Sequence, residues 1–381
     1  MKTIYLDNNA TTQPAPEVLD AMQPYLRDHF GNPSSVHGLG QRAAHAIDHA
    51  REQVASLIGA KPSQIVFSSG GTESNNLAIQ GVLADGIGSR HLVTTAVEHP
   101  AVLEVCQHLA DGGDAVTFAR VDSQGRLDLD QFESEITERT ALASVMWANN
   151  ETGVISPIEE IARITSERGV PLHVDAVNAV GKVPIDLDRI PVDMLSVSAH
   201  KLHGPKGVGA LFVRNSRLMR PLFFGGRQER DMRPGTENVA GIVGFGAAAQ
   251  SAAEAMDTWP ATARLRDRLE EGICRRVPIA QVNGDPLNRL PNTSNISFEA
   301  LMAEAVLLSL SEQGVCASSG SACSSGSVEP SHVLAAMGID RRHAHGAIRF
   351  SLSRYTTPDE IDATLEILPP IIERLARLMT A

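Results

Sequence analysis

The sequence predicts an α/β fold in which a mostly parallel sheet lies between helices, together with a smaller α+β domain. Three observations predict it. Between about residues 64 and 214, short apolar runs alternate with helical patterns that are long enough for crossover connections. After about residue 264, helical segments dominate, with two strand-like runs between them. The chain has 381 residues, a length at which about two domains are expected.

Six short apolar runs predict the strands of the large sheet. In chain order they are IVF (65–67), HLVTTAV (91–97), ALASVMW (141–147), VPLHVDAV (170–177), DMLSVSA (193–199) and VGALFV (208–213). Apolar runs of this length are typical of strands buried on both faces of a parallel sheet. Helices are expected between them, for example over 157–168. Ligands bind at the carboxyl ends of the strands in such sheets, so polar residues that directly follow these runs are the first candidates for a site.

The smaller domain is predicted from the C-terminal part of the chain. NTSNISF (292–298) and GVCASSG (314–320) are its strand-like runs, and a helical pattern over 359–380 closes the chain. The one compositionally biased segment is SGSACSSGSVEP (319–330), which is rich in serine and glycine and carries one cysteine.

Composition and charge exclude several classes of function. The net charge of −12 argues against a nucleic-acid partner, because neutralising phosphates requires clustered Lys and Arg. No apolar run approaches the roughly 20 residues of a membrane span, and the N-terminus lacks the apolar core of a secretory signal. The four cysteines are unevenly spaced and predict neither a disulfide framework nor a metal site. A cytoplasmic protein with free thiols is therefore expected.

Two glycines and a threonine follow the first predicted strand. In VFSSGGTESNN, Gly71 and Thr72 lead into a helix. Backbone N–H groups at a helix N-terminus bind anions, and glycine allows a phosphate to approach the backbone closely. The alternative is a tight turn in which Thr72 only caps the helix.

Three further strand ends carry reactive side chains. Asp175 in LHVDAVN either caps a loop or faces a buried cation, such as a protonated pyridine nitrogen. Lys201 in SVSAHKLHG is either a solvated loop charge or a desolvated amine that can form a Schiff base with an aldehyde. Ser198 and His200 beside it could donate to a phosphate. His99 in EHPAV is either a structural histidine or a ring that stacks on a cofactor and moves a proton.

Together these strand ends supply what a pyridoxal 5'-phosphate site requires: a phosphate cradle, an amine, an acid for the ring nitrogen and a flat ring to stack on it. A nicotinamide-dependent dehydrogenase is the alternative on fold alone, but the chain lacks a GxGxxG motif between a strand and a helix. No metal site is predicted, because the tightest histidine pair, HAH at 343–345, has no cysteine or carboxylate array beside it.

Motifs along nearly the whole chain resemble the cysteine desulfurases of the NifS/IscS type, in the class V aminotransferase group of fold-type I enzymes. They are YLDNNATT, FGNPSSVHGLG, SSGGTESNNLAI, EHPAV, NNETGVI, HVDAVNAVGK, SAHKLHGPKG, RPGTENV, SSGSACSSGSVEPSHVL and IRFSLSRYTT. The resemblance implies a seven-stranded sheet in a large domain over 15–258. It implies a small domain over 1–14 and 259–381, and a homodimer with active sites at the subunit interface.

The resemblance also implies a role for each matching residue. Lys201 would bond to the cofactor aldehyde, Asp175 would hold the pyridine nitrogen and His99 would stack on the ring. The phosphate would be held by Gly71, Thr72, Ser198, His200 and, from the other subunit, Thr236. Asn150 would lie near the cofactor and substrate. Arg349 would bind the substrate carboxylate as a bidentate fork, with Arg354 as the alternative.

Position 178 departs from the family pattern. The family usually has glutamine three residues after the aspartate, whereas this chain has Asn178. Its amide is one methylene shorter, so its hydrogen bond to the phenolic oxygen of the cofactor is expected to be longer, water-mediated or absent.

Cys323, in the serine- and glycine-rich segment, is predicted to be the catalytic nucleophile. The resemblance implies that L-cysteine is converted to L-alanine while its sulfur passes to Cys323 as a persulfide, and then to an acceptor protein such as an iron–sulfur scaffold. A Gly/Ser loop suits a thiol that must reach both the substrate and the acceptor protein. The other cysteines are predicted to be structural: Cys316 as a packed strand residue, and Cys106 and Cys274 on helices. Selenocysteine lyase, aminotransferase or a non-catalytic scaffold are the alternatives.

Overall fold

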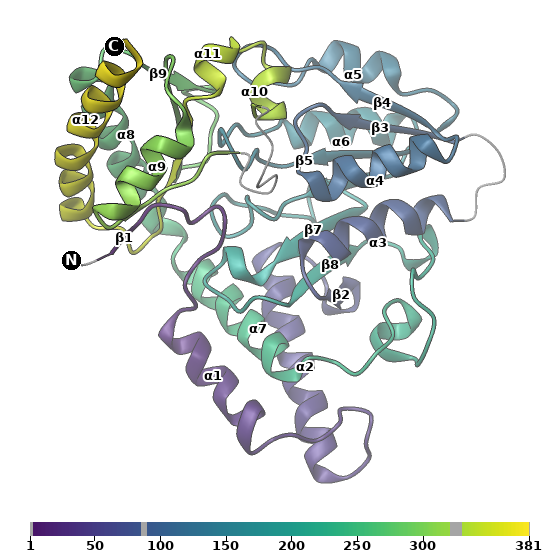
Figure 1. Ribbon diagram of the computed structural model, residues 1–381. Helices are drawn as coiled ribbons and strands as arrows, with labels where there is room; N and C mark the ends of the chain where they lie inside the picture. Colours follow the sequence, from purple (N-terminus) through teal and green to yellow (C-terminus); the bar gives the residue numbers. More distant parts are fainter. Residues whose placement is uncertain (1–2, 85–89, 321–329, 381) are drawn as a thin grey trace.

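A seven-stranded sheet forms the centre of the molecule (Figure 1). The computed structural model describes residues 3–84, 90–320 and 330–380. In spatial order the strands are β2 (Ile65–Ser68), β8 (Gly209–Val213), β7 (Met194–Ser198), β6 (Leu172–Asp175), β5 (Thr140–Met146), β3 (His91–Thr95) and β4 (Ala115–Ala119). β8 runs antiparallel to both of its neighbours, and the other pairs are parallel. The prediction of a mostly parallel sheet is confirmed.

β4 is the one strand of this sheet that the apolar runs did not predict. It pairs only with β3, and Phe118 on it remains 37% exposed. An edge strand is not buried on both faces, so its sequence lacks the continuous apolar run on which the prediction depended.

Helices cover both faces of the sheet. Neighbouring residues of a strand point to opposite faces, so Phe67 packs in one core with α2, α6 and α7, whereas Val66 packs in another with α3 and α4. The helices of this part are α1 (Pro16–Arg27), α2 (Gly38–Leu57), α3 (Gly71–Leu83), α4 (Pro100–Asp111), α5 (Leu129–Glu135), α6 (Ile158–Glu167) and α7 (Val239–Glu254). Its 3₁₀ turns are η1 (Pro62–Gln64), η2 (Ala199–Lys201), η3 (Ser216–Leu218), η4 (Gln228–Asp231) and η5 (Met256–Thr258).

A separate hydrophobic core lies under the C-terminal part, at the upper left in Figure 1. Its sheet is antiparallel, in the order β12 (Ala347–Ser351), β10 (Thr293–Phe298), β9 (Ala280–Asn283). The helices that pack on it are α8 (Trp259–Arg276), α9 (Ala303–Glu312) and α12 (Pro358–Thr380). Two short helices, α10 (His332–Ala336) and α11 (Arg341–Ala344), lie between this part and the large sheet.

The start of the chain belongs to this second core. β1 (Ile4–Tyr5) pairs in parallel with β11 (Val315–Cys316), and Ile4 and Leu6 are buried in the core. Asp7 forms a further bridge to Ser351 at the end of β12. Residues more than 340 positions apart are thereby brought together beside the large sheet.

Within the described ranges, no helix is both long and apolar enough to cross a membrane. In the same ranges, no group of three or more His, Cys, Asp and Glu side chains could hold a metal ion. The described cysteines are free thiols: Cys106 is buried in α4, Cys274 is exposed on α8, and Cys316 is half-buried in β11. Cys323 lies outside the described residues.

Candidate active site

A cavity of about 380 Å³ lies at the carboxyl ends of the parallel strands. The predicted site residues that line it are Gly71, Thr72, His99, Asn150, Asp175, Asn178, Ser198, His200, Lys201 and Arg349. Two other predicted residues lie elsewhere. Thr236 is exposed and does not line the cavity of its own chain, and Arg354 binds the Ser251 carbonyl on α7 at 2.9 Å.

Asp175 is a buried carboxylate held by amides. It ends β6, and its Oδ2 accepts from the Asn75 side chain at 2.7 Å while its Oδ1 accepts from the Val177 N–H at 3.0 Å. In the described part of the chain it forms no ion pair with a cation. Behind it, burial lowers the pKa of His173 to about 4, so that ring is neutral and adds no positive charge. Asp175 is therefore a buried acid whose charge remains available to a cation in the cavity.

The turn between β2 and α3 forms one wall of the cavity. Gly70 has φ 156°, a conformation that strains any residue with a side chain. A Cβ on Gly71 would lie 2.7 Å from Val177 Cγ2, so glycine is required there for the turn to pack against the loop after β6. Gly70, not Thr72, precedes the helix, so the alternative in which Thr72 caps it is wrong. Because α3 begins at Gly71, its first N–H groups face a site suited to an anion.

The Lys201 amine is tethered to the first residues of the chain. It ends η2, directly after β7, and its Nζ donates to the main-chain oxygens of Asn9 and Ala10. Beside it, His200 Nδ1 lies 3.1 Å from Thr11 Oγ1. Burial and then the Lys201 charge lower the pKa of His200 to about 4. A neutral histidine and an amine therefore lie together on one side of the cavity.

His99 lies four residues beyond β3, not at its end, and caps α4. Its Nδ1 accepts from the Ala101 N–H at 3.1 Å, so the neutral ring carries its hydrogen on Nε2. Burial lowers the pKa of His99, the Asp175 charge opposes this shift, and the Lys201 charge adds to it. The imidazole is therefore fixed in one tautomer at the cavity wall.

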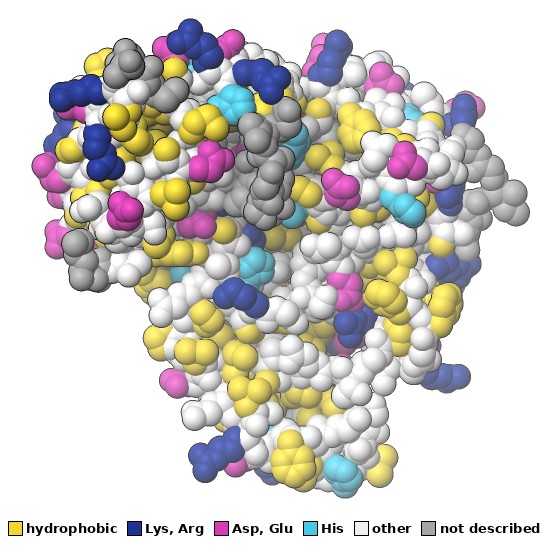
Figure 2. Space-filling model, viewed as in Figure 1, with side chains coloured by type: hydrophobic (Ala, Val, Ile, Leu, Met, Phe, Trp, Pro, Cys, Tyr) yellow, Lys and Arg dark blue, Asp and Glu magenta, His cyan; other side chains and the backbone are white. Residues whose placement is uncertain are grey.

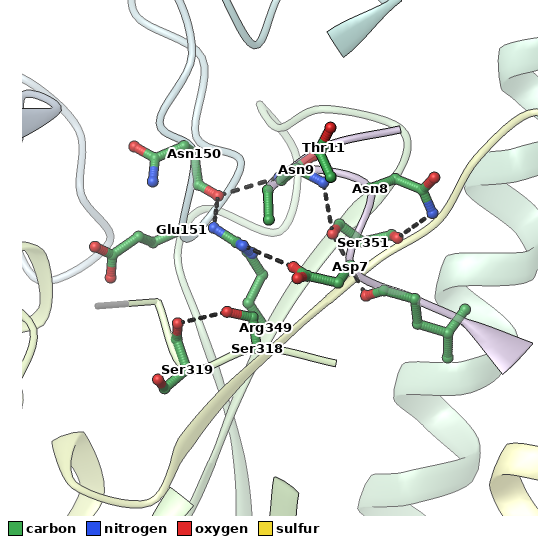
Figure 3. Close-up of polar contacts among 12 residues, drawn as sticks. Asp7, Asn8, Asn9, Thr11, Asn150, Glu151, Ser318, Ser319, Arg349 and Ser351 are labelled. Atoms are coloured by element: carbon green, nitrogen blue, oxygen red, sulfur yellow. Dashed lines mark hydrogen bonds and ion pairs between the residues drawn. The ribbon is translucent and has the colours of Figure 1, made fainter. Parts of the chain in front are cut away.

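Arg349 reaches the cavity from β12, between Asn150 and Asp7 (Figure 3). One terminal nitrogen donates to the main-chain oxygen of Asn150 at 3.0 Å, and the other donates to Asp7 Oδ1 at 2.9 Å. The guanidinium is thus held in one orientation by the large sheet and by the start of the chain. Arginine has five N–H donors, so further hydrogens remain for a carboxylate in the cavity.

Several residues in or near the cavity wall are missing from the sequence-based prediction. Asn75 is four residues after Gly71, a helical spacing that puts both on one face of α3 and so could have identified it. Asn9 belongs to the motif YLDNNATT, but only the folded chain brings it to Lys201. Lys182 and Glu151 are both buried in loops, several residues after a strand ends. No sequence pattern predicts the direction of a side chain at such positions.

The side chains around the cavity can bind four chemical groups. The turn before α3 suits a phosphate, Asp175 a protonated ring nitrogen, Lys201 an aldehyde carbon and Arg349 a carboxylate. Charges of both signs are interspersed over the face of the molecule that Figure 2 shows. Selectivity for these groups is thus a property of the cavity and not of one charged surface.

Three comparisons identify similar proteins. The family model described as Aminotransferase class-V matches residues 4–364. A protein named cysteine desulfurase from Nostoc sp. (strain PCC 7120) is 54% identical over 379 residues, which cover 99% of this chain and 95% of the relative. One named cysteine desulfurase NifS from Azotobacter vinelandii is 52% identical over 377 residues, which cover 98% and 94%. A solved structure titled NifS-like protein has a TM-score of 0.91 and 40% identity, and covers 98% of this chain and 100% of its own.

The matched family model extends over most of the chain and includes every predicted site residue. The two relatives match nearly the whole chain, and the solved structure shares its fold. This chain therefore belongs to the aminotransferase class-V family.

Proposed function

We propose that this protein is a pyridoxal 5'-phosphate-dependent cysteine desulfurase, which converts L-cysteine to L-alanine and passes the sulfur on. The observation that carries the proposal is the single cavity in which Lys201, Asp175, the turn before α3 and Arg349 meet. Identity of 52–54% to full-length proteins named cysteine desulfurase supports the same conclusion.

The residues present fit the cofactor. Asp175 is a buried carboxylate that forms no ion pair in the described ranges, and such a group is stable beside a protonated ring nitrogen. Asn75 Oδ1 and Asn178 Oδ1 are buried without a hydrogen-bond partner in the described structure, so each can accept a hydrogen bond from a polar group of the cofactor. Gly71, Thr72, Ser198 and His200 would hold the phosphate. When bound, pyridoxal phosphate supplies an aldehyde and a ring that withdraws electrons from the amino acid.

The chain's own residues bind and orient the substrate and move its protons. Arg349, fixed by Asn150 and Asp7, would bind the substrate carboxylate. Lys201 Nζ, held by two main-chain oxygens, would carry a proton to and from the substrate carbon. His99 would stack on the cofactor ring, and its Nε2, which carries a hydrogen, would move a proton to or from the substrate.

Cys323 is proposed as the thiol that receives the sulfur. It lies outside the described residues, so the proposal rests on the sequence around it and on the resemblance. The residues on either side of that segment support it: Gly320 lines the cavity, and Ser331 donates to Glu151 Oε2 at 2.5 Å. The function requires a free thiol, and a reducing compartment such as the cytoplasm is proposed for that reason.

A homodimer is proposed, with Thr236 contributing to the phosphate site of the partner. Arg233, three residues before it, binds Glu73 in the first turn of α3 at 2.8 Å, so this segment is anchored beside a phosphate cradle. Large apolar side chains are exposed on and after α1 and in the segment before η4, among them Leu26, Phe30 and Phe224 at 70%, 75% and 91%. Hydrophobic side chains are visible on the lower part of the molecule in Figure 2. Association of two chains would cover this apolar surface.

The domain division is proposed at 15–258 for the large domain, with 1–14 and 259–381 forming the small one. Separate hydrophobic cores support it, since Ile4 and Leu6 pack with α8, α9 and α12, whereas Ala15 and Val18 pack with the large sheet. An acceptor protein for the sulfur, such as an iron–sulfur scaffold, is part of the same proposal.

The decisive experiment traps the cofactor and follows the sulfur. Borohydride reduction of the loaded protein should fix the cofactor to a peptide that contains Lys201, and Lys201→Ala should lose turnover by at least about 10³-fold. Cys323→Ser should retain the spectrum of the bound cofactor but form no persulfide, whereas the control Cys316→Ser should behave as the unmodified protein. Normal desulfuration by Cys323→Ser would overturn the assignment of the nucleophile. Failure to bind the cofactor would overturn the whole proposal.

A further inference from the structure

Behind the cavity lies a buried lysine to which the proposed function gives no role. Lys182 is 5% exposed and follows β6, which ends at Asp175, in the same loop as Asn178. Its Nζ donates to the main-chain oxygen of Asn178 at 3.0 Å and to Asn9 Oδ1 at 3.5 Å. Both acceptors belong to residues that line the cavity. The Lys182 ammonium therefore lies one residue behind the cavity surface.

Asn9 connects Lys182 to Lys201. Its main-chain oxygen accepts from Lys201, and its side-chain oxygen accepts from Lys182. Asn9 is itself held by its Nδ2 group, which donates to Thr293 Oγ1 at 2.9 Å and to the Asn150 oxygen at 3.1 Å. Lys182 and Lys201 also border a common void of about 10 Å³. One residue held by two hydrogen bonds thus contacts both amines.

The surroundings of Lys182 are cationic. The charged groups that face it are Lys201, Arg354 and Arg349, the last of which is paired with Asp7, while His200 and His203 are neutral because burial lowers the pKa of each to about 4. In the ranges that the structure describes, Lys182 forms no ion pair with a carboxylate. Burial, and then the charges of Lys201 and Arg349, lower the pKa of Lys182 to about 7. Such an arrangement costs stability, because an aliphatic side chain would fill the same space without desolvating a charge.

We propose that Lys182 is a positioning residue for Lys201, whose amine it keeps less basic so that the amine can take a proton from the substrate. A cation a few Å behind an amine disfavours the protonated form of that amine. Only a neutral amine can accept a proton. The inference rests on the proposed function. It explains why a buried lysine without a carboxylate partner occupies this position.

The test is a pH titration of the absorbance of the bound cofactor, which follows the proton on the Lys201 nitrogen where that nitrogen is bonded to the cofactor, in three variants. Lys182→Met removes the charge and keeps an apolar stem, so the midpoint of the titration should rise by about one pH unit, a tenfold change in proton affinity. Lys182→Arg keeps a charge at every pH, so its midpoint should be equal to or below that of the unmodified protein. The matched control is Lys206→Met, an exposed lysine five residues from Lys201, which should leave the midpoint unchanged because solvent screens its charge.

Three outcomes are informative. A midpoint that rises in Lys182→Met and not in Lys182→Arg supports the proposal. Equal midpoints in the unmodified protein, Lys182→Met and Lys182→Arg would overturn it and leave Lys182 with a structural role only. If the unmodified protein takes up no pyridoxal phosphate, the proposed function fails instead. Thermal unfolding of each variant shows whether it is folded, and Lys182→Met should be at least as stable as the unmodified protein.

Discussion

Two groups of buried charged side chains in this molecule differ in whether their charges form ion pairs. At the outer edge of the large sheet, Arg51 and Glu229 form a bidentate ion pair with both distances at 2.7 Å. Glu229 also accepts from the Phe67 N–H, and Arg51 and Arg230 donate to the Ile65 oxygen. We call these residues the edge cluster. They satisfy backbone groups of β2 that have no strand beside them, and the charges of Arg51 and Glu229 neutralise each other.

Around the cavity, by contrast, Glu98, Glu151 and Lys182 are buried and form no ion pair in the described ranges. Burial raises the pKa of Glu98 to about 8, raises the pKa of Glu151, and lowers the pKa of Lys182 to about 7. In each case the shift favours the neutral form, and Glu98 Oε2 has no hydrogen-bond partner in the described structure. We call these residues the cavity group.

The difference separates a structural role from a functional one. Fully paired charges stabilise a fold at a sheet edge, whereas unpaired buried groups destabilise it and cluster where a ligand is to bind. The comparison predicts that changes in the edge cluster lower stability and leave turnover intact. Changes around the cavity should alter turnover or pH dependence more than they lower stability.

The largest expected effect on stability is in the edge cluster. Arg51→Met leaves Glu229 buried without its partner, so the free energy of unfolding should fall by about 3–5 kcal/mol. The midpoint of urea unfolding, taken at a fixed protein concentration, measures it. Turnover per folded molecule should stay within about twofold.

The matched control for Arg51→Met is Arg163→Met, which breaks an exposed Arg163–Glu167 pair of 2.9 Å and should cost less than about 0.5 kcal/mol. Equal losses of unfolding free energy in the two variants would contradict the distinction between a buried and an exposed ion pair. A large loss of turnover in Arg51→Met would show that the edge cluster also has a functional role.

The next effect is a pH dependence at Glu98. In the unfolded chain Glu98 ionises near pH 4.5, but in the folded chain only near pH 8. Its contribution to stability is therefore present below pH 4.5 and is lost as the pH rises towards 8. Glu98→Gln cannot ionise, so it should be more stable than the unmodified protein by on the order of a few kcal/mol at pH 8. The difference should shrink towards zero near pH 5.

Thermal unfolding across this pH range measures the effect of Glu98→Gln. The control is Glu104→Gln, an exposed glutamate on α4, for which little change is expected at any pH. A stability difference between Glu98→Gln and the unmodified protein that does not vary with pH would show that Glu98 is not buried in its neutral form.

A smaller effect distinguishes the two arginines. Arg349→Lys keeps the charge but loses the fork that contacts Asn150 and Asp7, so kcat/KM for cysteine should fall about 10- to 100-fold, or about 1.4–2.7 kcal/mol. Arg354→Lys, whose side chain points to α7, should change kcat/KM by less than about threefold. The reverse order would assign the substrate carboxylate to Arg354.

The smallest effect is expected at position 178. Asn178→Gln restores the glutamine usual in the family and adds one methylene in a cavity of about 380 Å³, so steric overlap is not expected. Steady-state turnover should change less than about fivefold, because a single neutral hydrogen bond contributes on the order of 1 kcal/mol or less. A tenfold change in either direction would show that Asn178 determines more than the strength of one contact.

The sequence predicted the position of a side chain at the cavity correctly where that residue ends a buried strand. Asp175 and Ser198 end buried strands, so the sheet itself brings them to one edge, and the order of the strands need not be known in detail. The prediction missed Asn9 and Lys182, because their positions depend on long-range packing between the two ends of the chain and on the direction of one side chain. β4 was missed for a third reason, since a half-exposed edge strand has no distinctive hydrophobic pattern.

The joining of both chain ends beside the cavity has a consequence for biosynthesis. Asn9 bonds to Ser351, and Asp7 bonds to Arg349, 342 positions later. At ribosomal rates of about 5–20 residues per second, the N-terminal half of this contact waits roughly 20–70 s for its other half to be translated. A nascent chain that ends before β12 lacks Arg349 at the cavity, so we expect a prematurely terminated polypeptide to be inactive however well its central sheet has formed.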